Sequence, residues 1–358
     1  MIVLSSNLKR IQDQLQAFYE YSHKHGLFFC VILSSSVEQS INAYLGGVRL
    51  TETFLLISII NLSQSELELL APYLDERASV LFVDVEKKHP FHTEGLVDSV
   101  KTRGESVRTT YSNIYAAAFE MLHDSVIIPW SPSRLTSVCA INTLRTDLGG
   151  NLSGQHVTIV GLGSVGFKLA LGLVEEGCTV SCFSQNIEKT SRLVQSINEI
   201  KSPYTISSAL HYNDINTAIA SSDNLVLTAS SRNIIDKSNL VFRDFSSALI
   251  LDVGKNSLTP DARQIVDNMS DLIYNRLDIT NELIRFVASS LAGVPLSSIP
   301  QRSKTIFKGA TQYVVSGGFP GSVGDLVVDN ALDPKFILGR IDDAGNYLPE
   351  PGLIDVCF

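Results

Sequence analysis

Three glycines, Gly161, Gly163 and Gly166, form a G-x-G-x-x-G pattern directly after the apolar run His156–Val160. In such a pattern the first glycine allows a tight turn, the second lets the backbone approach a pyrophosphate, and the third lets a helix pack closely on the strand. A following helix presents free N–H groups and the positive end of its dipole, which together attract phosphate. The pattern therefore predicts a dinucleotide site. The cofactor-binding residues expected in it are Gly161, Gly163, Ser164, Val165 and Gly166.

The neighbouring sequence strengthens this prediction, because the glycine pattern alone is a weak signal. Residues 167–176 have the apolar spacing of an amphipathic helix, and Gly177 follows as its terminator. A second apolar strand is expected at Thr179–Phe183. The order strand, glycine turn, helix, strand is the context in which this pattern binds a dinucleotide.

The residues after the second strand bear on the choice between NAD and NADP. An acidic side chain roughly 20 residues after the first glycine would accept hydrogen bonds from the ribose hydroxyls, whereas a basic one would favour a 2′-phosphate. The expected contacts here are Ser184, Gln185 and Asn186, with Lys189 or Arg192 one turn further on. No acidic residue stands at the strand end, so the cofactor is predicted to be NADP or NAD, with a preference for NADP.

Two later strands are expected to complete the pocket. In open α/β sheets ligands lie outside the carboxyl ends of the strands, and residues 224–228 and 248–253 read as such strands. The additional cofactor contacts predicted there are Thr228, Ala229, Ser230, Asp252 and Gly254. The segment 228–231 has an alternative interpretation as the cap of a helix.

Elements that would hold a second site precede this unit. Apolar strands alternate with helical stretches through the first 125 or so residues, which indicates a parallel sheet. The expected strands are 27–33, 53–60, 79–85 and 107–110. The expected helices are 5–26, 37–45, 63–75, 94–103 and 113–123.

The predicted fold class is therefore α/β, with two α/β domains, the second a Rossmann-type doubly wound parallel sheet, followed by a C-terminal helix and extension. The expected parts are a substrate or catalytic domain at 1–128, an interdomain turn and helix at 129–154, the dinucleotide domain at 155–278, and a returning helix and extension at 279–358. A glycine-rich loop at 317–324 is interpreted as a lid or a dimer contact.

Catalytic groups are expected at strand ends of the first domain. Asp84, Lys87 and Lys88 lie at the exit of its third strand, where a lysine and a carboxylate could polarise a carbonyl and transfer a proton. A solvated charged loop is the alternative interpretation. The predicted substrate contacts are Ser34, Ser35, Ser131 and Tyr111, although the serines after the first strand could equally cap a helix.

The order of these motifs resembles a known group. Pro129-Trp-Ser131-Pro132, then Gly154, Val165-Gly166 and Asp252-Val-Gly254-Lys-Asn256 resemble the methylenetetrahydrofolate dehydrogenase/cyclohydrolase pattern. Residues 186–193 and 228–231 are similar to the shikimate dehydrogenase and glutamyl-tRNA reductase groups. The resemblance implies a catalytic α/β domain before a Rossmann domain, with Ser131 close to substrate or cofactor. Gln185 replaces the arginine of those groups, and their catalytic motifs are missing from the first domain.

Composition restricts the partners. The formal charge of −9 and the pI near 5.3 disfavour nucleic acid. We expect no membrane contact, because no apolar run reaches the roughly 18 residues of a spanning helix, and a cytoplasmic location, because the start lacks a secretory signal. The scattered histidines and five cysteines lack metal-site spacing, so no metal is expected. A homodimer is expected by analogy.

Together these features predict an NAD(P)-dependent oxidoreductase that transfers a hydride between a nicotinamide and a small carbonyl or imine metabolite in an interdomain cleft. The alternative is a non-catalytic dinucleotide-binding sensor or partner protein descended from a dehydrogenase, which the missing catalytic motifs would favour. An adenylate-forming or other nucleotide-using enzyme is disfavoured, because no acidic strand end and no arginine near the phosphates are visible.

Overall fold

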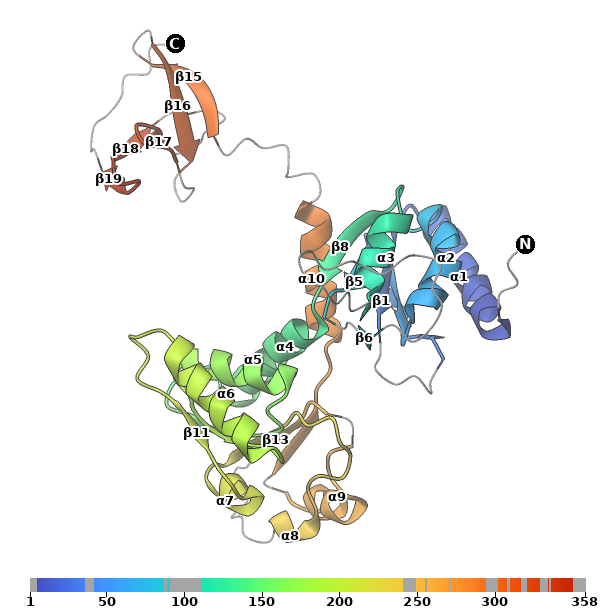
Figure 1. Ribbon diagram of the computed structural model, residues 1–358, viewed down its shortest axis with the longest axis vertical. Helices are drawn as coiled ribbons and strands as arrows, with labels where there is room; N and C mark the ends of the chain where they lie inside the picture. Colours follow the sequence, from blue (N-terminus) through green and yellow to red (C-terminus); the bar gives the residue numbers. More distant parts are fainter. Residues whose placement is uncertain are drawn as a thin grey trace, which may run out of the picture. The chain divides into compact units, whose positions relative to one another are not determined.

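The computed structural model describes residues 5–35, 42–86, 89–90, 111–240, 249–254, 256–270, 272–293, 302–307, 310–316, 321–328, 334 and 336–349. Internal contacts divide the chain into Met1–Ile284, which holds two six-stranded sheets and a two-stranded one, and Arg285–Phe358, which holds a five-stranded sheet. The predicted α/β class is confirmed (Figure 1).

The first sheet has the strand order β2-β4-β1-β5-β8, with β3 also paired to β4. Its parallel strands are β1 (Phe28–Ser34), β4 (Phe54–Ile60), β5 (Val80–Asp84) and β8 (Val126–Trp130). Two short strands, β2 (Tyr44–Leu45) and β3 (Arg49–Leu50), run antiparallel to β4. The sheet is therefore mixed, and the expectation of a purely parallel sheet is wrong.

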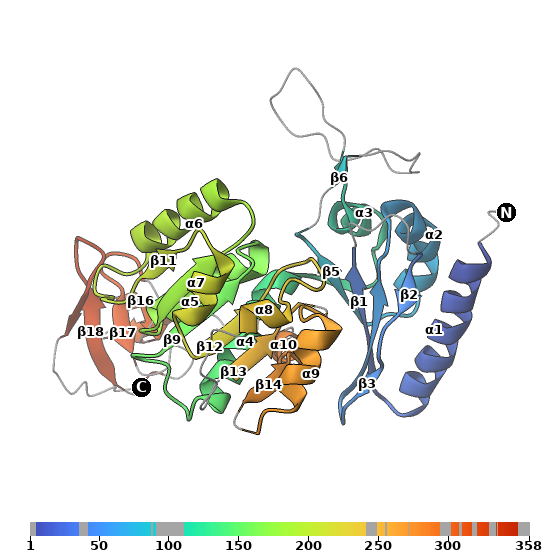
Figure 2. The same ribbon diagram turned by 90° about the horizontal axis from the view of Figure 1, so that it is seen from below.

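Three helices pack on this sheet, and they lie together on one side of it in Figure 2. They are α1 (Ser6–Lys24), α2 (Gln64–Asp75) and α3 (Ile114–Met121). Ser63 begins α2 with a capping box, because its hydroxyl accepts the Glu66 N–H and the Glu66 carboxylate accepts the Ser63 N–H. The apolar faces of the helices and strands form one buried cluster that includes Leu15, Leu67 and Leu81.

Two differences from expectation have physical reasons. Residues 44–45 belong to a strand and not to a helix, because they pair with β4 where Gly46 lies against the Ile60 side chain. Strand β8 was read in part as a turn, because Pro129 interrupts its apolar run. Proline is tolerated there because β8 is at the edge of the sheet. The expected elements at 94–103 and 107–110 lie outside the described residues.

The second sheet has six parallel strands in the order β11-β10-β9-β12-β13-β14. The strands are β9 (His156–Val160), β10 (Thr179–Phe183), β11 (Ala209–His211), β12 (Asn224–Leu227), β13 (Leu249–Asp252) and β14 (Ile273–Arg276). The chain leaves β9 toward one edge and returns to β12 on its other side. Such a reversal of strand order opens a crevice at the carboxyl ends of the strands.

Helices cover both faces of this sheet (Figures 1 and 2). One layer contains α4 (Pro132–Asp147), α5 (Ser164–Glu175) and α6 (Ile187–Ile200), which contact one another in sequence. The other contains α7 (Ile215–Ala220), α8 (Lys237–Leu240) and α9 (Pro260–Asp267). The strands lie buried between these two helix layers, which explains why the strand sequences are almost continuously apolar.

The region after 279 begins with the expected helix, α10 (Thr280–Gly293). The last part of the chain forms a five-stranded sheet that was not predicted. Its strands are β15 (Arg302–Phe307), β16 (Ala310–Ser316), β17 (Leu326–Val328), β18 (Ile337–Ile341) and β19 (Tyr347–Pro349). Of the glycine-rich loop, residues 317–320 lie outside the described residues.

Candidate functional site

The turn between β9 and α5 needs glycine at two positions for steric reasons. Gly161 has φ +106°, and a Cβ added there would lie 2.6 Å from the Cα of Ala229. A Cβ on Gly166 would meet the carbonyl of Gly161 and lie 2.8 Å from Thr228 Oγ1. These two glycines therefore let the β9 turn, the α5 helix and the end of β12 approach one another.

Gly163 differs from its neighbours because a Cβ there would meet nothing within 4 Å. It is the N-cap of α5, and no side chain among the described residues caps this helix, whereas Ser131 and Asn186 cap α4 and α6. The first N–H groups of α5 are left without a side-chain acceptor and carry the positive end of the helix dipole. Open space beside these donors fits a dinucleotide pyrophosphate.

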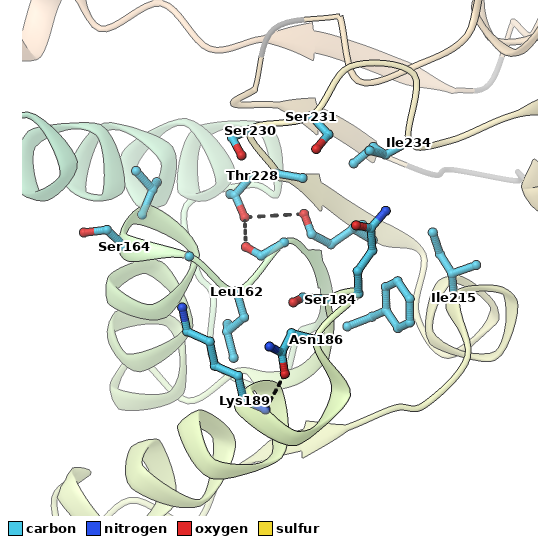
Figure 3. A pocket seen from close by; sticks show the side chains of 17 residues that line it. Leu162, Ser164, Ser184, Asn186, Lys189, Ile215, Thr228, Ser230, Ser231 and Ile234 are labelled. Atoms are coloured by element: carbon cyan, nitrogen blue, oxygen red, sulfur yellow. Dashed lines mark hydrogen bonds between the residues drawn. The ribbon is translucent and has the colours of Figure 1, made fainter. Parts of the chain in front are cut away.

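The end of β10 offers polar groups and a cation but no acid. Asn186 caps α6 by accepting the Lys189 N–H at 3.0 Å, while the Lys189 ammonium extends along the pocket (Figure 3). Ser184 and Gln185 also line this pocket, and Arg192 does not. The structure thus brings one of the two candidate cations to the predicted place.

At the end of β12, the Thr228 hydroxyl donates to the carbonyl of Gly161 and so supports the glycine turn. No helix starts here, since the next helix is α8 at Lys237. The alternative interpretation of 228–231 as a helix cap is therefore wrong. Ala229, Ser230 and Ser231 line the pocket instead.

These segments enclose a pocket of about 550 Å³. Predicted contacts that line it are Gly161, Gly163, Ser164, Val165, Ser184, Gln185, Asn186, Thr228, Ala229 and Ser230. Apolar walls that the sequence reading missed come from Val160, Leu162, Phe183, Ile215 and Ile234. Each of these is an apolar residue at or near the end of a strand or the start of a helix. Ordinary core residues occupy the same kinds of position, so the sequence alone does not mark these residues as pocket walls.

Three predicted cofactor contacts, Gly166, Asp252 and Gly254, do not line the pocket. Asp252 is 1% exposed and accepts hydrogen bonds from the Ser257 hydroxyl at 2.7 Å and the Tyr274 hydroxyl at 3.1 Å. A Cβ on Gly254 would lie 2.8 Å from the carbonyl oxygen of Ala229. In the structure these residues support the pocket walls, and their direct contact with cofactor stays a prediction.

The residues predicted to act in the first domain are likewise found in different settings. Asp84 has no exposed surface, and its carboxylate accepts the Ser35 hydroxyl at 3.2 Å and the Glu86 N–H at 2.8 Å. Ser34 ends β1, and Tyr111 lies in β7 (Tyr111–Ser112), paired with β6 (His89–Pro90). Lys87 and Lys88 lie outside the described residues. Their catalytic and substrate roles stay predictions.

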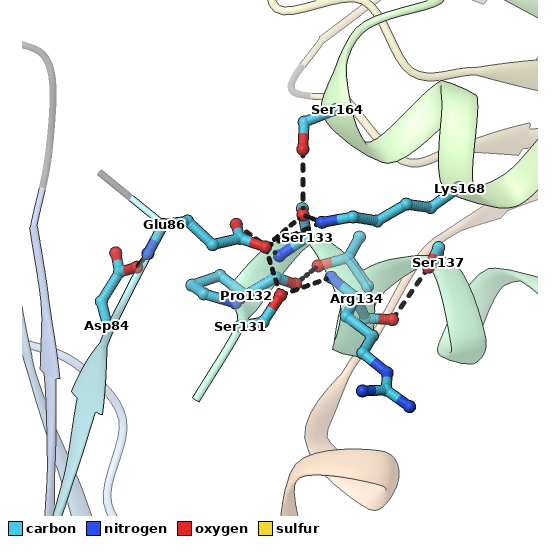
Figure 4. A network of polar contacts seen from close by, with 10 residues as sticks. Asp84, Glu86, Ser131, Pro132, Ser133, Arg134, Ser137, Ser164 and Lys168 are labelled. Carbon is cyan, nitrogen blue, oxygen red and sulfur yellow. Dashed lines mark hydrogen bonds and ion pairs between the residues drawn. The ribbon is translucent and has the colours of Figure 1, made fainter. Parts of the chain in front are cut away.

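A polar network joins the end of β5 to the N-termini of α4 and α5 (Figure 4). Four donors reach the carboxylate of Glu86: the hydroxyls of Ser131 and Ser133, the N–H of Ser133 at 3.0 Å, and the ammonium of Lys168 at 2.9 Å. The Lys168 ammonium also donates to the Ser133 hydroxyl. Ser131, the predicted substrate contact, is thus a member of this network and the N-cap of α4.

The network contacts the pocket through one hydroxyl. Ser164, the first residue of α5, lines the pocket and donates to Ser133 Oγ at 3.0 Å. Sequence reading missed Glu86, Ser133 and Lys168 as a group. The available signals were the closeness of Glu86 to Asp84 and the spacing of Ser164 and Lys168, which puts them on the same face of α5.

The network keeps Glu86 ionised. Burial favours the neutral carboxyl, but the hydrogen bonds from Ser131, Ser133 and Lys168 outweigh it and lower the pKa of Glu86 from 4.5 to about 2. A carboxylate at the N-terminus of α4 is also stabilised by the helix dipole. Glu86 is therefore a fixed negative charge at neutral pH and not a proton donor.

The described cysteines are buried free thiols, namely Cys30, Cys139, Cys178 and Cys182. Burial raises the pKa of Cys30 to about 12, which disfavours a nucleophilic thiolate in the middle of β1. Among the described residues, no group of three or more His, Cys, Asp or Glu side chains could hold a metal ion. The helices of the described segments include none with the length and apolar content needed to cross a bilayer.

Comparison with known families gives a match for part of the chain. The model of the shikimate/quinate 5-dehydrogenase family matches residues 143–271, from the end of α4 through the end of α9. This region is similar to the NAD(P)-binding domain of that family. The predicted resemblance is confirmed for this dehydrogenase domain, and the family binds NAD(P). A search of curated protein sequences found no match.

Solved structures with a similar arrangement include glutamyl-tRNA reductase from Methanopyrus kandleri, with 20% identity and a TM-score of 0.33, over 44% of this chain and 39% of that one. L-tryptophan dehydrogenase from Nostoc punctiforme matches with 13% identity and a TM-score of 0.40, over 75% and 76%. Ornithine carbamoyltransferase from Pyrococcus furiosus matches with 11% identity and a TM-score of 0.44, over 82% and 94%. These values do not indicate an activity. The matched part spans about two fifths of the glutamyl-tRNA reductase.

Proposed function

We propose that the protein is an NADP-dependent oxidoreductase that interconverts a small carbonyl or imine metabolite and its reduced form. The observation that carries this proposal is the pocket over the uncapped N-terminus of α5, within a domain of the shikimate/quinate dehydrogenase type. When bound, a nicotinamide dinucleotide supplies or accepts the hydride. The chain's own residues bind it, orient it and hold polar groups beside the substrate.

The preference for NADP rests on the end of β10. Lys189 lines the pocket, and none of its described lining residues carries a carboxylate, so a 2′-phosphate would gain a cation and meet no repelling acid there. Ser184 adds a hydroxyl at the same strand end. One feature weighs against this preference, since Gln185 stands where related groups have arginine.

The test is a fluorescence titration of the purified chain with NADPH and with NADH. We expect NADPH to bind at least tenfold more tightly, which corresponds to about 1.4 kcal/mol. Lys189→Met should weaken NADPH binding by about tenfold and leave NADH binding within twofold. Arg192→Met is the matched control, because Arg192 is on the same helix but does not line the pocket.

Each contrary result would overturn a different part of the proposal. Tighter binding of NADH would overturn the cofactor preference, and equal effects of Lys189→Met on both nucleotides would overturn the role of Lys189. Absence of binding by either nucleotide would overturn the proposed function. Tight binding with no turnover of any carbonyl or imine would favour the non-catalytic sensor. The predicted homodimer and small-molecule substrate remain proposals.

A further inference from the structure

In the network around Glu86, the polar groups differ in how many of their donors and acceptors are hydrogen-bonded. A carboxylate has about four lone-pair sites, and four donors reach that of Glu86. The Ser133 hydroxyl donates to Glu86 and accepts from Ser164 and Lys168. The Ser131 hydroxyl donates to Glu86 and accepts the N–H of Arg134 at 3.3 Å. These three groups are satisfied.

Lys168 is the exception. An ammonium has three N–H donors, and within the described part of the chain two of them are used, one on Glu86 and one on Ser133. Its side chain is 38% exposed, so the third donor is accessible to a ligand. Asp84, the catalytic carboxylate predicted from sequence, is by contrast completely buried.

Position supports a ligand at this donor. Lys168 lies one turn after Ser164 on α5, and Ser164 lines the dinucleotide pocket. The carboxylate of Glu86 and the hydroxyl of Ser133 fix the ammonium from the β5 and α4 side (Figure 4). A preorganised cation beside a cofactor pocket is the arrangement that stabilises negative charge developing on a substrate oxygen.

We infer that Lys168 is the substrate-binding cation of the proposed reaction and that the substrate presents a carbonyl oxygen, not an imine, to its third N–H. The inference rests on the proposed function. A carbonyl oxygen is an acceptor for this donor, whereas a protonated imine carries its own N–H and a positive charge that the ammonium repels. Lys168 is the catalytic residue in this scheme, and Glu86 and Ser133 are positioning residues.

In the direction of reduction, the carbonyl carbon gains the hydride that the reduced dinucleotide supplies, and the C=O π pair becomes a lone pair on oxygen. That oxygen takes a proton from the Lys168 ammonium and becomes the alcohol, and the resulting amine recovers a proton from water. Glu86 stays ionised throughout and holds the Lys168 nitrogen in place through their contact at 2.9 Å.

The first experiment measures oxidation of NADPH by the full chain with a panel of aldehydes, ketones and 2-keto acids, each with and without ammonium chloride. We expect turnover of at least one carbonyl without ammonium. A reaction that requires ammonium would overturn the carbonyl assignment. Failure of the whole panel in protein that binds NADPH would overturn the inference, whereas failure to bind NADPH would overturn the proposed function first.

Variants then test Lys168 itself. Lys168→Met should lower kcat by about 10²- to 10³-fold, the usual cost of removing one donor to a developing oxyanion, with the NADPH Kd changed by less than about threefold. Lys168→Arg should recover part of kcat. Lys9→Met, on the exposed side of α1, is the control and should leave kcat unchanged. A Lys168→Met variant that binds NADPH and keeps its kcat would overturn the inference.

A second measurement does not depend on turnover. Acetic anhydride modifies exposed amines, and mass spectrometry would follow the modification of Lys168 and Lys9. NADP⁺ together with the carbonyl compound forms a complex that cannot react, and we expect it to protect Lys168 and not Lys9. Equal protection of both lysines, or of neither, would contradict contact between Lys168 and the substrate.

Discussion

The glycine pocket and the Glu86 network adjoin each other through Ser164, yet they are built on opposite principles. The pocket depends on backbone that comes close because side chains are absent at Gly161 and Gly166. The network depends on side chains from three separated segments, at Glu86, at Ser131 and Ser133, and at Lys168. A backbone site leaves a short local pattern in the sequence, and a side-chain site of this kind does not.

The difference also sets how each region should respond to substitution. Backbone approach fails abruptly when a Cβ is added, because the interior cannot deform cheaply around it. A hydrogen-bonded network loses one contact at a time, and the cost depends on what remains unpaired. Substitutions in the pocket should therefore act on folding or cofactor binding, and those in the network on charge and turnover.

The largest effect is expected from Gly161→Ala. Its positive φ and the 2.6 Å approach of the new Cβ to Ala229 Cα combine backbone strain with overpacking, which together cost about 2–5 kcal/mol. Thermal unfolding and NADPH titration should show a destabilised protein with little binding. Gly163→Ala is the matched variant, since its Cβ meets nothing within 4 Å. It should keep its stability and lose about tenfold in NADPH affinity.

This pair separates a folding glycine from a binding glycine. If both variants lost the same amount of stability, the weaker NADPH binding of Gly163→Ala would come from a disturbed glycine turn and not from filling the space beside Gly163. Full NADPH affinity in Gly163→Ala would show that the pyrophosphate does not approach this residue.

A smaller effect is expected from Glu86→Gln. The pKa of Glu86 falls from 4.5 in the unfolded chain to about 2 in the folded protein, so its ionisation stabilises the fold at pH values above 4.5. This contribution, at most about 3 kcal/mol, is lost as the pH falls from about 4.5 to about 2. The unfolding midpoint of Glu86→Gln should lie several degrees below that of the wild type at pH 7, and the gap should narrow through that window.

A gap that stays constant with pH would contradict this account, because it would trace the loss to shape and not to charge. Asp267→Asn is a suitable control. Its carboxylate pairs with Arg263 at the surface, and an exposed pair of this kind contributes little.

The same difference between local and distant contacts explains which features could be predicted from the sequence. The glycine turn, α5 and β10 were predicted because their signals are local, and two of the predicted cofactor contacts, Asn186 and Thr228, line the pocket. Strand β8 was partly missed because Pro129 and its half-buried edge position remove the usual apolar run. The last sheet was missed because its short strands carry exposed apolar residues, such as Leu338 and Tyr347, that obscure the alternation of a half-buried strand.

The network was beyond a reading of local patterns. Glu86 and Lys168 lie 82 positions apart, and their contact depends on the pairing of β5 with β8 and on the entry of the chain into α4. Asp84 is the last residue of β5, and Glu86 lies two positions further on. Alternation along a strand would put both side chains on the same face, so it could not distinguish them. They are separated because the chain leaves the strand after Asp84: Asp84 turns toward Ser35 in the interior, and Glu86 lies beyond the strand end at the N-terminus of α4.

The smallest effect is expected where the two regions meet, at Ser164→Ala. The variant removes one hydroxyl that donates to Ser133 at 3.0 Å, and it leaves the backbone N–H groups of α5 in place. NADPH affinity should change by less than threefold, because those N–H groups, not the hydroxyl, are the expected phosphate donors. If Lys168 acts on the substrate through a position fixed by Ser133, kcat should fall by about two- to tenfold, and the loss should disappear in a Lys168→Met background. Such non-additivity, measured as a double-mutant cycle, would show that the hydroxyl acts through Lys168. Additive losses would instead make Ser164 part of the pocket alone, and the two regions would then be neighbours without functional coupling.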